Sequence, residues 1–500
     1  MHFLDELAKR GMLLDPAAAR YLEAKEDPLN FLARLPMDLD ATLVLTLEAI
    51  QDAERIGRDA GAAARPPVAA ALLMPAPALE PTPELSIVPP KAVARQVSPA
   101  EEFADDLKVL RDVTGNSTCH GSVEDFTRVF RNRLQAISGM LRQRRELSAT
   151  VTLERGKSLL REFAFTAIVS DVRTTRNGHR MLSVEDDTAT ADLLIPNSSP
   201  AFQETFLEDE VIGAVARGGD KGFLIADAIF RPDVPNGRPP RTIAEDFIVG
   251  FLSDVHVGSK KFLDEQWGAF TNWASGNEPL ARAMKYLVVS GDVVDGIGIY
   301  PRQDEELAVD DIYAQYEELA KRLTALPDHL RVIMLPGNHD AVRPAEPQPT
   351  FPQSVRKLFD SQITFLGNPS LFSLHGLKVL AYHGRSMDDW VSGLPGMSYH
   401  RPLDVMREML RRRHLAPMYG GKTPIAPEAE DYLVINDVPD IFVTGHVHSV
   451  GVGEYHGVHM INASTWQAQT SFQKMHNVQP SPACVPLLNV HTGRATVQSF

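Results

Sequence analysis

Cysteine is scarce in this sequence: Cys119 and Cys484 are the only two among 500 residues. Two cysteines cannot supply a disulfide framework for so long a chain, so we expect folding in a reducing cytoplasm. No apolar run approaches the roughly 18–20 residues that a membrane span needs. The N-terminal MHFLDELAKRG is amphipathic and acidic, unlike a signal peptide. The sequence therefore predicts a cytoplasmic protein with no membrane partner.

Basic residues are also in short supply. Fifty lysines and arginines stand against 65 aspartates and glutamates, which gives a net charge of −15. Proteins that grip nucleic acid by themselves are usually basic, so this balance argues against a self-sufficient DNA clamp. It does not exclude a nuclease, because metal ions and partner subunits can also supply positive charge.

The remaining composition is that of a globular protein, with 44% hydrophobic and 23% charged residues. These values exclude collagen-like, coiled-coil and wholly disordered chains. The length predicts roughly three domains. Thirteen of the 16 histidines lie between His256 and His491. We therefore expect the chemistry of the protein to reside in the C-terminal half.

The N-terminal part divides into three segments. Residues 1–59 carry apolar positions at helical spacing, which predicts a helical interaction domain. Residues 60–100 form an Ala/Pro-rich linker, with nine prolines and eleven alanines in 61–100, a composition typical of an extended tether. Residues 101–148 predict a helical segment: one helix in EEFADDLKVLRDVTG, then a turn and a longer amphipathic helix in VEDFTRVFRNRLQAISGMLRQR.

Between residues 149 and 240 the apolar period changes to two. Five short β-rich segments are joined by turns such as Asn177-Gly178, which predicts a small β-barrel of the oligonucleotide-binding (OB) type. Its aromatic residues are equally compatible with a barrel core and with a platform for stacking bases; they are Phe163, Phe165, Phe223 and Phe230. The sequence leaves open whether this barrel contacts DNA.

Residues 241–500 repeat one pattern, in which a buried-type strand delivers polar residues into the loop at its carboxyl end. The five segments are FIVGFLSDVHVG, YLVVSGDVVDG, RVIMLPGNHD, LKVLAYHGR and DIFVTGHVHSVG. Residues 309–326 read as one of the intervening helices. Ligand sites of layered α/β folds gather at such strand ends, so we expect an α/β domain whose site combines all five loops. Because alternate residues of a strand share a face, Asp254 and His256 should lie on the same side.

The residues in these loops suit a pair of metal ions. Carboxylate oxygens and imidazole nitrogens, without any thiolate, favour borderline divalent ions. Two such ions about 3.5–4 Å apart can clamp a phosphoryl group during in-line displacement. We expect two divalent ions, with Mn²⁺ as the first choice and Zn²⁺, Fe²⁺ or Mg²⁺ as alternatives.

The motifs DVH, GDVVD, GNHD, YHG and GHVH resemble the motif series of the calcineurin-like metallophosphoesterases. The resemblance implies a four-layered α/β fold with a dinuclear centre. One ion would be held by Asp254, His256 and His448, and the second by Asn338, His383 and His446, with Asp292 bridging the two. His339 would face the leaving oxygen as the general acid or as a transition-state stabiliser, and Asp295 would orient it.

The segments GDVVDGIGIYP, PGNHDAVRPAEPQP, YHGRSMDDW and NASTWQAQTSFQ resemble the small subunits of archaeal family-D DNA polymerases, and so does the order of the domains. This resemblance covers residues 101–500 well and the first sixty loosely. It implies a 3′-to-5′ exonuclease that removes misincorporated nucleotides from single-stranded or mismatched DNA 3′ ends. It also implies a large catalytic polymerase subunit as partner.

Two other functions stay open on the sequence alone. A scaffold subunit without activity is disfavoured, because no expected ligand is missing. A phosphoesterase for small substrates would need the same centre, and only the additional barrel and N-terminal modules argue against it.

Overall fold

The computed structural model describes residues 98–500 except 160, 220, 221, 476 and 477, and before residue 98 only 13–14, 21–22, 25, 31 and 44–45. The chain separates into one unit over residues 1–95 and a second over 96–500. Most of the helical domain expected in 1–59, and of the linker expected in 60–100, lies outside the described residues. Within the first unit, β1 (Leu13–Leu14) and β2 (Val44–Leu45) pair as short parallel strands. At these four residues the helical prediction is wrong, because short apolar runs fit either conformation.

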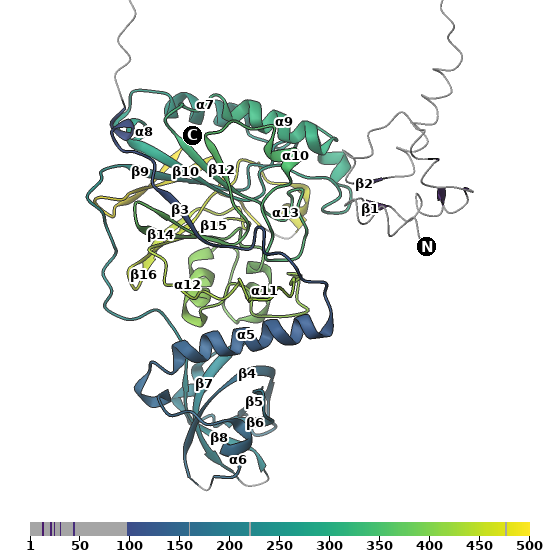
Figure 1. Ribbon diagram of the computed structural model, residues 1–500, viewed down its shortest axis with the longest axis vertical. Helices are drawn as coiled ribbons and strands as arrows, with labels where there is room; N and C mark the ends of the chain where they lie inside the picture. The colour runs from purple at the N-terminus through teal and green to yellow at the C-terminus, as the bar shows by residue number, and fades with distance from the viewer. Residues whose placement is uncertain are drawn as a thin grey trace, which may run out of the picture. The chain divides into compact units, whose positions relative to one another are not determined.

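The C-terminal body is built on two six-stranded sheets (Figure 1). The first has the order β12 (Ile363–Phe365), β11 (Arg331–Leu335), β10 (Met284–Ser290), β9 (Ile248–Leu252), β18 (Cys484–Asn489) and β19 (Ala495–Ser499). The second has the order β16 (Gly451–Tyr455), β17 (Val458–Asn462), β15 (Ile441–Thr444), β14 (Leu377–Ala381), β13 (Ser370–Leu374) and β3 (Leu107–Asp112). Strands β9 to β12 are mutually parallel, and so are β14, β15 and β17. The carboxyl ends of these strands therefore share one edge in each sheet.

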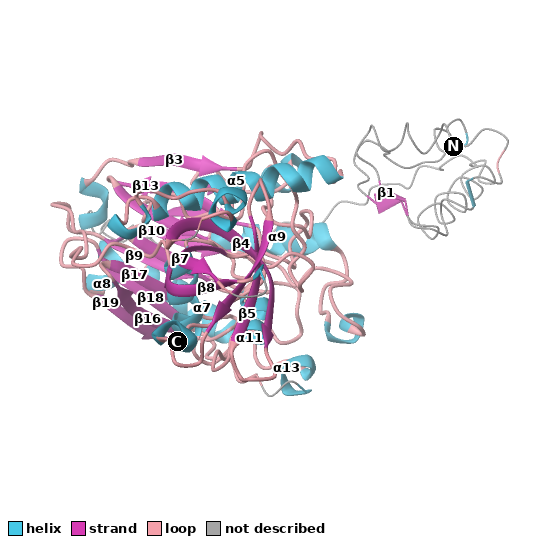
Figure 2. Cartoon of the chain, turned by 90° about the horizontal axis from the view of Figure 1, so that it is seen from below, coloured by secondary structure: helices cyan, strands magenta, loops and turns pink. Residues whose placement is uncertain are grey.

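Helices cover the outer faces of both sheets. The helices of the body are α7 (Asp264–Ala274), α8 (Pro279–Ala283), α9 (Ile312–Leu323), α10 (Gln353–Arg356), α11 (Met387–Gly393), α12 (Pro402–Arg412) and α13 (Ser471–Met475). Phe270 of α7 and Tyr316 of α9 are buried with the first sheet, and Trp390 of α11 is buried with the second. Phe251 of β9 belongs to a separate core between the sheets, which also contains strands of both. Figure 2 shows the strands of both sheets lying together. The body thus has four layers, and the expected α/β class is confirmed.

Strand β3 corrects one expectation about residues 101–148. The helix expected in EEFADDLKVLRDVTG is wrong: Pro99–Glu102 forms one 3-10 turn, and Leu107–Asp112 is an edge strand paired with β13. Its partner lies more than 250 residues away in the sequence, so a local pattern carries no trace of it. This segment therefore completes the C-terminal body, although it precedes the barrel in the chain.

A closed barrel of five strands follows α5 (Val123–Leu141), the longer helix of the sequence prediction, and the short α6 (Leu153–Lys157). Its order is β4 (Phe163–Thr174), β5 (Arg180–Glu185), β6 (Thr190–Ile195), β8 (Leu224–Phe230) and β7 (Val211–Gly218). Phe165 is fully buried in the barrel core, and Phe163 is 6% exposed. These two aromatic residues are therefore core residues and not a platform for bases.

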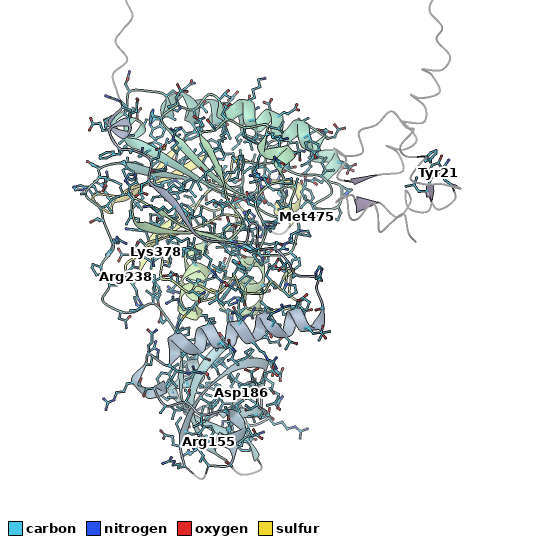
Figure 3. All side chains as sticks on the ribbon, in the orientation of Figure 1. Tyr21, Arg155, Asp186, Arg238, Lys378 and Met475 are labelled. Atoms are coloured by element: carbon cyan, nitrogen blue, oxygen red, sulfur yellow. The ribbon has the colours of Figure 1, made fainter. Side chains whose placement is uncertain are left out.

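Helix α5 joins the barrel to the body, as Figure 1 shows. The buried Arg133 of α5 donates to the carbonyl oxygen of Asp209 beside the barrel (3.0 Å) and to that of Pro417 in the body (2.6 Å). The return connection is anchored by Arg238, which donates to Asp440 and to the carbonyl oxygen of Pro439. Figure 3 labels Arg238 near Lys378, whose backbone N–H also donates to Asp440 (2.8 Å). The barrel is thereby fixed to the domain that carries the expected metal ligands.

Candidate metal centre

The expected ligands follow the carboxyl ends of strands in both sheets. Strands β9, β10 and β11 of the first sheet precede Asp254 and His256, Asp292, and Asn338. Strands β14 and β15 of the second sheet precede His383, and His446 with His448. The two sheets therefore contribute together to one site, as the repeated strand-and-loop pattern predicts.

Three of these residues form a first group. The Nε2 atom of His448 lies 3.3 Å from Asp254 Oδ1 and 3.1 Å from His256 Nε2. One ligand atom from each of the three residues lies within 4.8 Å of the other two. All three side chains are buried, and Asp254 is fully so. This group matches the set that the resemblance to the metallophosphoesterases implies for one ion.

A second group surrounds Asp292. The Nε2 atom of His383 lies 3.3 Å from Asp292 Oδ2 and 3.0 Å from Asn338 Oδ1. Ligand atoms of Asp292, His383 and His446 also lie within 4.8 Å of one another. All seven expected ligands thus fall into two adjacent groups.

Many of these residues adopt a backbone conformation that non-glycine residues rarely occupy. Five of the seven expected ligands have positive φ angles: Asp254 (51°), His256 (53°), Asp292 (50°), His446 (69°) and His448 (56°). Such conformations cost of order 1–3 kcal/mol each and cluster at functional sites. Asp254 and His256 do lie in one group, but the predicted reason, that alternate residues of a strand share a face, is wrong. Both residues lie beyond the last residue of β9, in left-handed turns.

Two glycines allow the loops to approach one another. A Cβ atom at Gly337 would lie 2.2 Å from Asp292 Oδ1, and one at Gly445 would lie 1.8 Å from Ser253 Oγ. Neither position has room for a side chain. The glycines of the GNHD and GHVH motifs are therefore required by the close packing of the candidate centre.

His339 lies at the partly open side of the centre, with 14% of its side chain exposed. Its Nδ1 is 2.7 Å from the carbonyl oxygen of Asp295, and its Nε2 is 3.8 Å from Asp292 Oδ2. Burial lowers the pKa of His339. The imidazole is thus held by one nitrogen while the other faces the centre.

The carboxylate of Asp295 has a different position from the one expected. It lies 3.1 Å from Nδ1 of His256 and accepts from Gln467 Nε2 (2.9 Å) and Gln303 Nε2 (3.3 Å). His339 forms its hydrogen bond with the main-chain carbonyl of Asp295, and the Asp295 carboxylate lies within 4.8 Å of both His256 and His339. The side chain therefore orients the ligand His256, and the backbone orients His339.

Three polar residues beside the ligands were missed by sequence reasoning. Asp388 Oδ2 of α11 lies 3.3 Å from His446 Nε2, and Gln473 Nε2 of α13 lies 2.8 Å from His448 Nδ1. Asn368 Oδ1 accepts from the backbone N–H of His383 (2.8 Å). The acidic pair in YHGRSMDDW was the available signal for Asp388, whereas Gln473 and Asn368 lie in segments without a strand-end motif.

The residues present fit divalent cations. Burial opposes ionisation of Asp254 and Asp292, yet the surrounding histidines hold the pKa of each below its ordinary value. Burial also opposes ionisation of Asp295, and its contact with His256 holds that pKa low. Asp254 Oδ1 is buried and accepts no hydrogen bond. Buried carboxylates of this kind are stable when they are paired or coordinate a metal.

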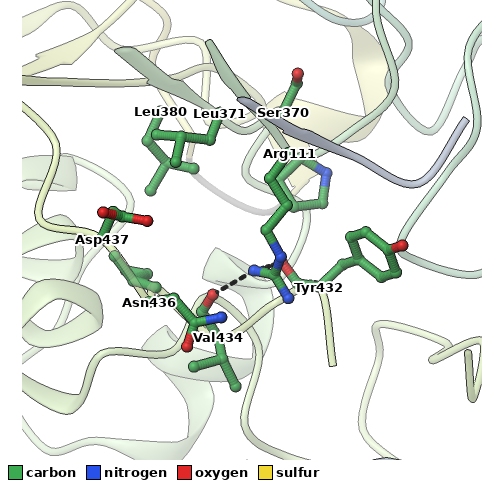
Figure 4. A pocket seen from close by; sticks show the side chains of 10 residues that line it. Arg111, Ser370, Leu371, Leu380, Tyr432, Val434, Asn436 and Asp437 are labelled. Carbon is green, nitrogen blue, oxygen red and sulfur yellow. Dashed lines mark hydrogen bonds between the residues drawn. The ribbon is translucent and has the colours of Figure 1, made fainter. Parts of the chain in front are cut away.

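A cavity elsewhere in the body does not belong to this site. Figure 4 shows it between Arg111, Leu371, Tyr432 and Asp437, with Arg111 donating to the carbonyl oxygen of Val434 (2.8 Å). Its volume of about 20 Å³ holds no more than a water molecule. It is therefore not a substrate site.

Comparison with known proteins identifies the family. A protein-family profile for the B subunit of DNA polymerase alpha/epsilon matches residues 252–450. The chain is 45% identical to the DNA polymerase II small subunit of Archaeoglobus fulgidus, over 79% of this chain and 81% of that protein. It is 37% identical to that of Methanothermobacter thermautotrophicus over 97% of both chains, and 36% identical to that of Halobacterium salinarum over 99% and 98%.

Among solved structures, the chain is similar to an archaeal phosphodiesterase, with 12% identity over 51% of this chain and 100% of that one and a TM-score of 0.26. It is also similar to vacuolar protein sorting 29 from Cryptosporidium parvum, with 14% identity over 51% and 96% and a TM-score of 0.25. The sequence relatives, which match along most of their length, decide the assignment. The chain belongs to the family of archaeal DNA polymerase II small subunits.

Proposed function

We propose that this protein is a 3′-to-5′ proofreading exodeoxyribonuclease that hydrolyses DNA phosphodiesters with the help of two divalent ions. The observation that carries the proposal is the convergence of seven ligand side chains, five of them in left-handed backbone, on two adjacent groups. A scaffold without activity has no need of so costly an arrangement. The subunit therefore acts as an enzyme and not only as a support.

The two groups divide the proposed work between them. Asp254, His256 and His448 would hold one ion, Asn338, His383 and His446 would hold the other, and Asp292 would serve both. When bound, divalent ions withdraw charge from a phosphodiester and lower the pKa of a coordinated water. Mn²⁺ suits the mixed oxygen and nitrogen donors, and Zn²⁺, Fe²⁺ and Mg²⁺ are alternatives.

His339 supplies the proton for the departing strand end. Because Nδ1 lies 2.7 Å from the carbonyl oxygen of Asp295, that nitrogen carries a proton and donates it in a hydrogen bond. The Nε2 atom is then the one that faces the centre and, when protonated, delivers a proton to the 3′ oxygen of the leaving strand. The carboxylate of Asp295 stabilises the position of His256 rather than that of His339.

Partner and substrate follow from the family and from charge. The relatives are named small subunits, so we propose a large catalytic polymerase subunit as partner. Phosphate contacts from lysine and arginine dominate non-specific DNA affinity, and a net charge of −15 leaves little of it to this chain alone. The large subunit would hold the DNA and deliver an unpaired 3′ end to the centre. The closed barrel, whose OB type and DNA contact are part of this proposal, would lie beside that path.

The proposal is tested with 5′-labelled DNA in Mn²⁺, using matched and 3′-mismatched primers, and with the isolated chain and the two-subunit complex at equal salt. We expect a ladder that shortens from the 3′ end, faster on the mismatch and in the complex. The Asp254→Asn variant is the control for contaminating nucleases. Hydrolysis of bis(p-nitrophenyl) phosphate without degradation of DNA would favour a small-substrate phosphoesterase. Hydrolysis of neither substrate would favour the scaffold.

A further inference from the structure

The loop that follows Asp295 exposes large apolar side chains beside the candidate centre. Ile297 is 47% exposed and Ile299 is 39% exposed, and Tyr300 follows directly. Residues 296–301 read Gly-Ile-Gly-Ile-Tyr-Pro and carry no charge. Exposed apolar side chains that gather in one place are more often part of a binding surface than isolated ones. This loop, residues 296–300, is therefore a candidate for contact with substrate.

Hydrogen bonds hold the loop in place. Buried Gln315 accepts from the backbone N–H of Gly296 (2.9 Å) and donates to its carbonyl oxygen (3.2 Å). Buried Gln303 accepts from the N–H of Ile299 (2.9 Å) and donates to the carbonyl oxygen of Asp295 (2.7 Å). The two isoleucines are therefore presented to solvent by a fixed backbone.

The loop lies directly against His339. A Cβ atom at Gly296 would lie 2.3 Å from the carbonyl oxygen of His339, so the two backbones are in contact. The rings of Tyr300 and His339 are 6.4 Å apart between centroids, and the Tyr300 hydroxyl donates to Glu306 (3.1 Å). The exposed apolar side chains of the loop thus lie next to His339, the proposed proton donor of the centre.

We propose that Ile297 and Ile299 form a subsite for the nucleobase of the 3′-terminal nucleotide. This inference rests on the proposed function. If the centre binds the phosphodiester of the 3′-terminal nucleotide, the base of that nucleotide lies only a few ångströms away. The loop offers no charged side chain to a phosphate, but its apolar side chains can pack against the face of any base without reading the sequence. Apolar side chains such as isoleucine also insert between bases in other nucleic-acid complexes.

The subsite supplies a physical reason for preferring unpaired ends. A base inside a duplex has its faces covered by its neighbours, so it must leave the stack before it can contact the loop. Unstacking costs least for a mismatched or single-stranded base. Ile297 and Ile299 therefore select frayed 3′ ends by contact with the base, while the centre cleaves without regard to sequence.

The first test measures binding by the full chain in EDTA at low salt, so that no hydrolysis occurs. Fluorescence anisotropy compares a thymidine decamer with the same strand lacking only its 3′-terminal base. The wild-type chain should bind the complete strand about fivefold more tightly. The Ile297→Ser/Ile299→Ser double variant should lose this preference, and Leu280→Ser, which changes an equally exposed residue on α8, should keep it.

An unchanged preference in the double variant, or its absence from the wild-type chain, would overturn the subsite. Hydrolysis in Mn²⁺ gives a second readout: the ratio of kcat/KM for complete over abasic 3′ ends should fall about fivefold in the double variant. If wild-type protein binds with the base preference but cleaves nothing, the proposed function fails while the subsite stands. If the double variant retains the base preference but no longer binds the large polymerase subunit, the loop is a partner surface and the subsite is refuted.

Discussion

At the scale of single residues, the candidate centre depends on backbone conformation as much as on side-chain chemistry. Left-handed turns at Asp254, His256 and Asp292 direct their side chains toward residues contributed by the second sheet. Each turn is disfavoured for a non-glycine residue by itself. The surrounding fold stabilises all of them together, which is typical of a preorganised site.

A variant of His339 can distinguish the proposed proton transfer from metal binding. His339→Ala should retain both ions and lose most hydrolysis of single-stranded DNA, since positioned proton transfer typically contributes about 10²–10⁴-fold. Metal content and kcat are measured on the same preparation. The exposed His491, which contacts the carbonyl oxygen of Ile243, provides the matched control as His491→Ala. Loss of metal from His339→Ala would show that this residue is a ligand.

A variant of Asp388 tests whether residues that contact the expected ligands of the second group contribute to metal binding. Its carboxylate lies 3.3 Å from His446 Nε2, which leaves the other ring nitrogen of His446 for a metal ion. Outer partners of ligand histidines typically contribute about 10–100-fold to metal affinity. Asp388→Ala should weaken one of two binding events in calorimetric titration by about that factor, whereas Asp404→Ala on α12 should change neither. If both binding events in Asp388→Ala keep their wild-type affinities, Asp388 does not support the site.

At the scale of secondary-structure elements, α5 is the connection that matters most, because it joins the barrel to the body. Its apolar face is completed by Leu134, Ile137 and Leu141, which pack with residues of both parts. Arg133 of the same helix is 1% exposed and pairs with Asp431 (2.8 Å), which is 2% exposed. The helix is therefore held by packing and by a buried ion pair.

Arg133→Met should destabilise the folded protein by about 3–5 kcal/mol, because it leaves the Asp431 carboxylate buried without its main partner. Chemical denaturation measures the difference. The exposed Arg142 near the end of the same helix is the control, since Arg142→Met should change stability by about 0.5 kcal/mol or less. A cost below about 1 kcal/mol for Arg133→Met would mean that the pair contributes little to holding α5.

The elements that carry the site could be predicted from sequence, and their detailed positions could not. Buried runs such as Ile248–Leu252 and Ile441–Thr444 predict strands, and parallel strands bring their carboxyl-end loops together. The left-handed turns at Asp254 and His256 arise from contacts with other loops, so no local pattern announces them. The helix expected at the edge strand Leu107–Asp112 is wrong because its one strand partner among the described residues, β13, is remote in sequence.

The same limit applies to the residues around the ligands. Metal-binding motifs identify the side chains that would contact an ion. Six of the expected ligands lie in two groups, and Asn338 contacts His383 of the second group. Asp388 and Gln473 contact the expected ligands from short helices, α11 and α13, and belong to no metal-ligand motif themselves. The carboxylate of Asp295 is in direct contact with His256 and only near His339, an arrangement that depends on the paths of two loops.

At the scale of the whole molecule, stability should depend on pH through His414, where α5 meets the body. Its Nδ1 accepts from the N–H of Ala416 (3.1 Å), and its Nε2 lies 3.0 Å from Asp431 Oδ2. Burial, together with the nearby Arg133, lowers the pKa of His414 to about 4, against roughly 6.5 in an unfolded chain. The unfolded chain therefore takes up this proton first as pH falls. Stability should be full above about pH 6.5 and should decline toward about pH 4.

Denaturation midpoints between pH 7.5 and 4.5 measure this dependence. His414→Gln should flatten the part of the curve between about pH 6.5 and 4.5, relative to wild-type protein under the same conditions. Both proteins are compared in EDTA, so that protonation of the metal-binding histidines contributes equally. Parallel curves for the two proteins would show that His414 does not set the acid sensitivity.

Within the part of the chain that the structure describes, none of the helices has the length and hydrophobicity of a membrane span. The molecule combines a centre rich in carboxylates and imidazoles with a barrel fixed rigidly to the same body. Because the chain has a surplus of fifteen negative charges, the proposed function assigns DNA affinity to the partner subunit. In this account the small subunit supplies hydrolysis, and the large subunit supplies the grip on DNA.

The central claim is that the seven side chains hold two divalent ions, and metal content tests it most directly. The chain is reconstituted with Mn²⁺ and freed of excess metal, and the number of metal ions per chain is measured by elemental mass spectrometry. The account predicts two ions per wild-type chain and clearly fewer in Asp292→Ala, because the shared carboxylate no longer screens the two cations from each other. One ion or none in the wild-type chain, or two ions retained by Asp292→Ala, would contradict it.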